Sequence, residues 1–157
     1  MSQTGTVTHA AGPTQAGRLA RLRMASLGAV VMLILEFVLG MIYNLYGTAP
    51  TADKPVGLFS SPGLALHVIL GLLLFITAVV LLIRAIGARH RLAIWMSAVG
   101  LVSIIGAGAA GLGFTRSGAS GASLGMSLAF ALALACYVVL VFALAPPPGA
   151  SGPRRPA

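Results

Sequence analysis

Apolar residues do not alternate with polar ones in this chain, but gather in four long stretches. The stretches cover residues 24–46, 62–86, 93–114 and 122–145. Each is long enough to cross a bilayer as a helix, which takes about 20 apolar residues. Each must be helical, because lipid offers no hydrogen-bond partners to exposed backbone groups. The pattern predicts an all-α integral membrane four-helix bundle, with disordered cytoplasmic tails at 1–23 and 146–157.

Composition supports a membrane domain and leaves no room for a soluble one. The chain is 58% hydrophobic and 8% charged, and its mean hydropathy is +1.00. A soluble domain is about 45–50% apolar and about a quarter charged. The predicted partner is therefore the lipid bilayer itself.

The basic residues predict the topology. The formal net charge is +8. The ten basic residues are Arg18, Arg21, Arg23, Lys54, Arg84, Arg89, Arg91, Arg116, Arg154 and Arg155. They are dense before the first stretch, around the second connection and after the last stretch, and such segments face the cytoplasm. We expect a multi-pass protein of the plasma membrane with both termini cytoplasmic. The basic flanks suit anionic lipid, and no aromatic-interleaved groove indicates nucleic-acid binding.

Glu36 is a carboxylic acid in the middle of the first apolar stretch. Residues 29, 33, 36, 40 and 44 share one helical stripe, which joins small residues to Glu36 and Asn44. An acid near the bilayer centre costs on the order of 2.5–3.5 kcal/mol on insertion scales. We predict that Glu36 faces the bundle interior, mostly neutral and hydrogen-bonded, either as a polar clasp between helices or as a proton site.

His67 lies a few residues inside the second stretch, on a stripe with Gly71. Its depth, about 7–8 Å below the helix end by rise alone, is less than the roughly 15 Å expected for Glu36. Direct contact between the two would then need tilt or a water. The expected hydrogen-bond partners of His67 are Asn44 and Tyr43, or the two serines Ser123 and Ser127.

The two halves of the chain also match in spacing. Ser26 to Gly40 has the same spacing as Ser97 to Gly111, and a chosen register lays His67 on Met126. The match predicts two repeated helical hairpins with His67 and Met126 at similar depth. The small residues of "GAGAAGLG", at 106–113, predict close packing against a neighbouring helix.

The layout resembles small four-span bacterial membrane proteins. It is also loosely similar to four-helix membrane cytochromes of the b type, and the His67-x-x-x-Gly71 pattern is the best matching piece. That resemblance implies a haem b held by inward histidines. Here only one span contains a histidine, so Met126 would have to be the second axial ligand, with slots for haem beside Gly71 and Gly125.

Three functions remain open. The favoured hypothesis is a non-enzymatic structural or accessory subunit that contacts other membrane subunits or copies of itself; it needs no cofactor. Short connections and the lack of a Ser/His/Asp set or a carboxylate pair favour it, so no catalytic residue and no metal ligand is assigned. The alternatives are a haem-binding electron-transfer protein that uses His67 and Met126, and a small proton-linked transporter that uses Glu36.

Overall fold

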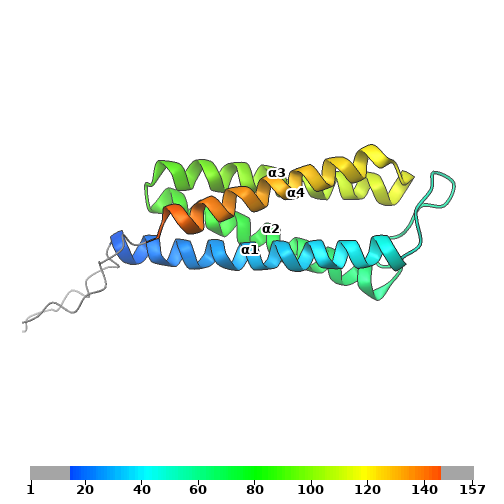
Figure 1. Ribbon diagram of the computed structural model, residues 1–157, viewed down its shortest axis with the longest axis horizontal. Helices are drawn as coiled ribbons and strands as arrows, with labels where there is room; N and C mark the ends of the chain where they lie inside the picture. The colour runs from blue at the N-terminus through cyan, green and yellow to red at the C-terminus, as the bar shows by residue number, and fades with distance from the viewer. Residues whose placement is uncertain (1–14, 146–157) are drawn as a thin grey trace, which may run out of the picture.

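The computed structural model describes residues 15–145, and within them the regular structure is helical. Helix α1 spans Gln15–Tyr46, α2 spans Pro62–Gly87, α3 spans Arg91–Ser117 and α4 spans Ser120–Ala143. Consecutive helices run antiparallel and form an elongated four-helix bundle (Figure 1). All four are long and apolar enough to cross a membrane. The predicted fold class is thereby confirmed, and the chain is an integral membrane protein.

The first helix begins at Gln15 rather than at Met24. The segment "RLARLR", counted with the disordered tail in the sequence-based prediction, is helical instead. Arginine, leucine and alanine are strong helix formers, and Leu22 is buried against the other helices. The remaining parts of the predicted tails, 1–14 and 146–157, lie outside the described residues.

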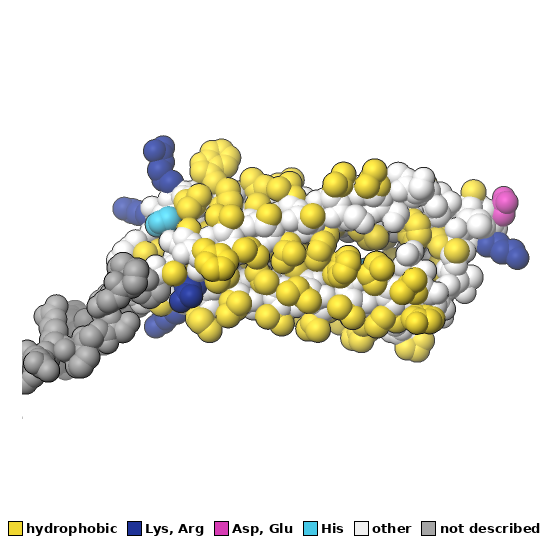
Figure 2. All heavy atoms as spheres, in the orientation of Figure 1, with side chains coloured by type: hydrophobic (Ala, Val, Ile, Leu, Met, Phe, Trp, Pro, Cys, Tyr) yellow, Lys and Arg dark blue, Asp and Glu magenta, His cyan; other side chains and the backbone are white. Residues whose placement is uncertain are grey.

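The two ends of the bundle differ in character. One end carries the start of α1, the connection between α2 and α3, and the end of α4; we call it the basic end, because Arg18, Arg21, Arg84, Arg89 and Arg91 lie there. The other end carries the long segment 47–61 and the short connection between α3 and α4; we call it the loop end. Figure 2 shows charged side chains at both ends and apolar ones between them.

Each helix packs against two others around the bundle. Contacts join α1 to α2, α2 to α3, α3 to α4 and α4 to α1, while within the described residues the backbones of the diagonal pairs do not come close. The α3–α4 contact is the most extensive, in keeping with the small residues predicted to permit close approach. Gly113 lies opposite Ala122, and Gly125 lies opposite Ala110.

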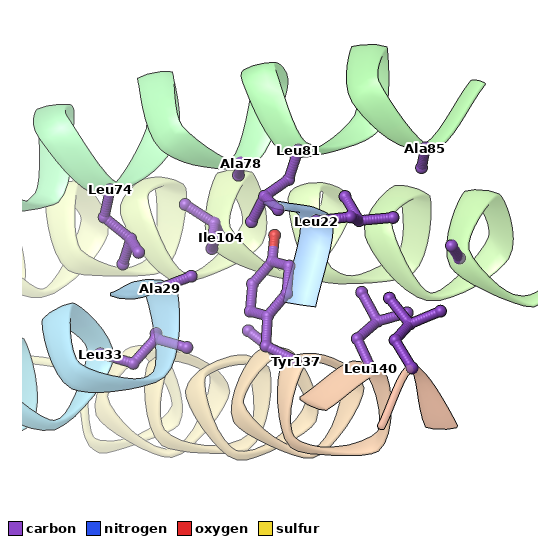
Figure 3. Close-up of a cluster of buried hydrophobic side chains, with 13 residues drawn as sticks. Leu22, Ala29, Leu33, Leu74, Ala78, Leu81, Ala85, Ile104, Tyr137 and Leu140 are labelled. Carbon is purple, nitrogen blue, oxygen red and sulfur yellow. The ribbon is translucent and has the colours of Figure 1, made fainter. Parts of the chain in front are cut away.

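The buried core lies in the half of the bundle nearer the basic end. Its largest side chains, Leu22, Leu33, Leu81, Tyr137 and Leu140, come from three helices and meet in the interior (Figure 3). No helical residue is buried beyond Leu33 in α1 or before Ala133 in α4. Figure 1 shows α1 and α4 close together at the basic end and farther apart toward the loop end.

Backbone contacts tie the long segment 47–61 to the end of α3. The Val56 amide donates to the Thr115 carbonyl at 2.9 Å. Gly118 ends α3 with a φ of 65°, and a Cβ atom there would collide with the Pro50 carbonyl. Only glycine suits both the left-handed backbone and the close approach at this position.

Two pairs of positions matched by the predicted repeat have similar surroundings. Ser26 and Ser97 are both fully buried. At matching distances along the chain, Gly40 faces the His67 ring and Gly111 faces the Met126 sulfur, with ideal Cβ positions 3.3 Å and 3.5 Å from those side chains. The register that pairs His67 with Met126 therefore corresponds to equivalent packing positions.

Candidate functional site

The structure brings Glu36 and His67 together across the contact between α1 and α2. Glu36 Oε1 lies 3.3 Å from His67 Nδ1, within ion-pair distance. The sequence predicted different partners for His67, among them Asn44 and Tyr43 near the end of α1. The depths estimated from the helix ends predicted direct contact only with tilt or a bridging water, whereas the structure places the two side chains in direct contact.

Glycines on the facing helices explain this contact. Glu36 lies over Gly71, where an added Cβ atom would be 2.8 Å from Oε1; His67 lies over Gly40, where an added Cβ would be 3.3 Å from ring atom Cε1. The two side chains are thus offset along the helices, and each fills the space that the other helix leaves at a glycine. Long side chains bridge an offset of about 5.4 Å, one helical turn, so the contact is direct and no bridging water is required.

The polar atoms of the pair are largely withdrawn from solvent and lipid. The Glu36 side chain is 14% exposed and the His67 side chain 25%. Glu36 Oε2 and His67 Nδ1 are buried and have no hydrogen bond of good geometry within the described residues. Although Oε1 and Nδ1 are close, the ring N–H direction is not aligned for a hydrogen bond. The pair therefore has unused capacity to hold a proton.

The pair lies at the edge of the buried core. Glu36 follows the buried Leu33 by one turn, and beyond this point α1 has no buried residue. Phe37, next to Glu36, stacks on Phe130 of α4 with ring centroids 5.2 Å apart. This ring contact joins α1 to α4 where the helices have begun to separate.

The other predicted polar candidates do not join the pair. Asn44 is exposed near the end of α1, and the Tyr43 hydroxyl donates to the Thr48 carbonyl at 3.2 Å. On α4, the Ser127 hydroxyl donates to the Ser123 carbonyl of its own helix at 3.0 Å. Local backbone groups satisfy these hydroxyls, as is common for such residues in membrane helices.

The geometry bears on haem in two opposing ways. A carboxylate beside one ring nitrogen of a histidine is the usual partner of a metal-bound imidazole, and Glu36 stands in that relation to His67. However, Glu36 fills the space beside Gly71, and Ala110 lies opposite Gly125. The two slots expected for haem are therefore occupied by protein atoms, and we derive no step through haem.

Two buried hydroxyls were not predicted from the sequence. Tyr137 and Ser97 are fully buried, and neither hydroxyl has a hydrogen-bond partner among the described residues. The Tyr137 ring lies directly on Gly100, whose Cβ position would be 2.8 Å from ring atom Cζ. Leu-rich and Ala-rich stretches surround both residues, so periodicity gave no signal for their burial.

The described residues form no metal site, and the chain matches no known protein. Within residues 15–145 no three His, Cys, Asp or Glu side chains lie close enough together to hold a metal ion. Comparison of the chain with protein-family models, with curated proteins and with solved structures gave no match.

Proposed function

We propose that this membrane protein is a small proton-linked transporter whose proton-binding site is the Glu36–His67 pair. The observation that carries the proposal is the 3.3 Å approach of a carboxyl group and an imidazole inside two membrane-spanning helices. Ionisable residues inside a membrane are costly, and Asp, Glu and His chains there are typical of proton relays.

The repeat argues against a purely structural role for the pair. Counted from Ser97, Ala107 holds the place that Glu36 holds after Ser26, and Met126 corresponds to His67. The second hairpin packs its helices, including Gly111 against Met126, without any ionisable group at these positions. A polar clasp is therefore not required to join two helices in this architecture.

The chemistry of the pair suits the binding of a single proton. With a carboxylate and a neutral imidazole, the pair carries one negative charge, which is expensive in a poorly solvated site. One added proton makes the pair neutral overall, whether it rests on Glu36 or on His67. The density of basic residues favours a cytoplasmic basic end, which places the loop end on the outer side of the membrane.

Infrared difference spectroscopy on protein reconstituted in lipid tests this proposal. We expect a carboxyl band that changes between pH 5 and pH 9 and is absent in Glu36→Gln. Asp53, the other acidic residue of the chain, is exposed at the loop end and provides the control, so Asp53→Asn should keep the band. If Glu36 gives no pH-dependent band in this range, it does not exchange a proton and the transporter proposal is wrong.

Proton movement into liposomes is the second measurement. A pH-sensitive dye inside the vesicles should report faster proton uptake for the wild type than for Glu36→Gln under an imposed membrane potential. The Asp53→Asn protein should behave like the wild type. Equal rates for wild type and Glu36→Gln, together with a titrating carboxyl band, would restrict the pair to proton binding without transport.

Haem binding stays a prediction: a carboxylate lies beside His67, but protein atoms fill the slots expected beside Gly71 and Gly125. A Soret band in protein produced with haem, lost in His67→Ala, would support it. The accessory-subunit hypothesis and self-association stay predictions, since no contact within the described chain identifies a partner.

A further inference from the structure

Two adjoining hollows lie at the basic end, where the start of α1 meets the end of α2. The larger has a volume of about 590 Å³ and is lined by Gln15, Arg18, Ile86, Gly87, Ala88 and Arg89. The smaller has a volume of about 280 Å³ and is lined by Arg18, Arg21, Arg84, Gly87 and Ala88. Arg18, Gly87 and Ala88 line both, so the two hollows adjoin at the end of α2.

Hydrogen bonds join the start of α1 to the end of α2 beside the hollows. The Gln15 side-chain amide donates to the Ala88 carbonyl at 2.9 Å, and Arg18 donates to the Gly87 carbonyl at 3.4 Å. These carbonyls belong to the end of α2, where backbone acceptors lack helical partners. The two bonds therefore hold the first turn of α1 against the last turn of α2 and keep Arg18 beside both hollows.

No acidic side chain of the protein neutralises these arginines. The chain has two acidic residues. Glu36 is engaged with His67 within the membrane, and Asp53 lies at the loop end. Within the described part of the chain, the side chains of Arg21 and Arg84 make no ion pair. Several guanidinium groups thus face a shared space with an excess of positive charge.

We propose that the two adjoining hollows bind the phosphate group of an anionic phospholipid. Guanidinium groups bind phosphate oxygens through paired, charge-assisted hydrogen bonds. Basic pockets between membrane helices, at the level of the headgroups, suit such lipids. Ile86 lines the larger hollow and is 55% exposed, so an apolar surface for an acyl chain adjoins the phosphate site. This inference does not depend on the proposed transport function.

Native mass spectrometry of the detergent-solubilised protein tests the site. The probes are dioleoylphosphatidylglycerol, dioleoylphosphatidylcholine and inorganic phosphate. We expect one retained phosphatidylglycerol, and binding at least about tenfold weaker in the double variant Arg18→Gln/Arg84→Gln, because two charge-assisted hydrogen bonds to the phosphate would be lost. Phosphatidylcholine, which has no net charge, should not be retained.

The matched control is Arg91→Gln/Arg116→Gln. It removes the same charge, but neither residue lines a hollow. This variant should bind phosphatidylglycerol as the wild type does; an equal loss would mean general charge attraction and would overturn the proposal. Full displacement of the lipid by an equal concentration of inorganic phosphate would assign the hollows to free phosphate instead.

The single variant Arg21→Gln changes an exposed residue, and it separates loss of the site from loss of folding. It should weaken lipid binding while the helical circular dichroism stays unchanged. Unchanged lipid binding in this variant would contradict the site.

Discussion

Gly71 lies directly beneath the Glu36 carboxyl, and a Cβ atom on Gly71 would be 2.8 Å from Oε1. Such a separation is too short for two non-bonded heavy atoms of this kind. The glycine therefore makes room for the carboxyl group that meets His67. Gly71 is visible in the sequence as a small residue one turn after His67, and in the structure it helps to set the geometry of the candidate site.

Gly71→Ala should displace the Glu36 carboxyl without unfolding the protein. The atom in the way is the end of a flexible side chain, and alanine favours a helix by about 0.5–1 kcal/mol relative to glycine. We expect a near-normal free energy of unfolding but a shifted infrared carboxyl band. Gly63→Ala, on the same helix with nothing within 4 Å of the new Cβ, is the control and should leave the band in place. An unshifted band in Gly71→Ala would show that the carboxyl does not lie over this glycine.

The double variant Glu36→Ala/His67→Met should fold, because it gives the first hairpin the residues that the second carries at equivalent places. Removing both polar partners together leaves no unpaired charge behind. We expect a free energy of unfolding within about 1 kcal/mol of the wild type, measured by titration with a denaturing detergent. Leu33→Ala, which leaves a cavity at a buried core position, should lower the free energy of unfolding by about 2–5 kcal/mol and serves as the reference for a large loss. An equally large loss of unfolding free energy in the double variant would mean that the pair acts as a polar clasp between α1 and α2.

The sequence predicted the four helices because a bilayer requires long apolar segments with internally bonded backbones. It also predicted the inward stripes, since Ala29 and Leu33 on α1 and Leu74 on α2 are buried as expected. It did not predict the contact between Glu36 and His67, because depths counted from helix ends ignore how far long side chains extend along the helix axis. The direction in which they extend depends on the partner helix, where Gly40 and Gly71 leave the space.

The membrane orientation is testable by cysteine labelling in a Cys136→Ser background. Ala52 at the loop end and Gly87 at the basic end are both exposed, and a Cβ at Gly87 meets nothing within 4 Å. The positive-inside pattern predicts that Ala52→Cys reacts with an impermeant thiol reagent on intact cells and that Gly87→Cys reacts only after permeabilisation. The reverse labelling would place the basic end outside.

Gly100→Ala should destabilise the protein much more than Gly108→Ala. A Cβ atom at Gly100 would lie 2.8 Å and 2.9 Å from Tyr137 ring atom Cζ and the hydroxyl oxygen, whereas Gly108 has nothing within 4 Å. A buried ring cannot move aside as a flexible chain does, and overpacking a core costs about 1–3 kcal/mol. Detergent-titration unfolding of the two variants measures the difference. Equal stability would mean that α3 and α4 are not in close contact at Gly100.

Tyr137→Phe should leave the protein as stable as the wild type or more stable. The Tyr137 side chain is fully buried, and its hydroxyl makes no hydrogen bond within the described residues. Removing an unsatisfied buried hydroxyl relieves a desolvation cost of roughly 1–3 kcal/mol, while the ring keeps its packing. Tyr137→Ala, in contrast, should lose about 3–5 kcal/mol, because it empties the space between α3 and α4. Tyr46→Phe is the matched control at an exposed side chain, with an expected change within about 0.5 kcal/mol. If Tyr137→Phe instead loses more than about 1 kcal/mol of unfolding free energy, the hydroxyl has a partner in the membrane that stabilises the bundle.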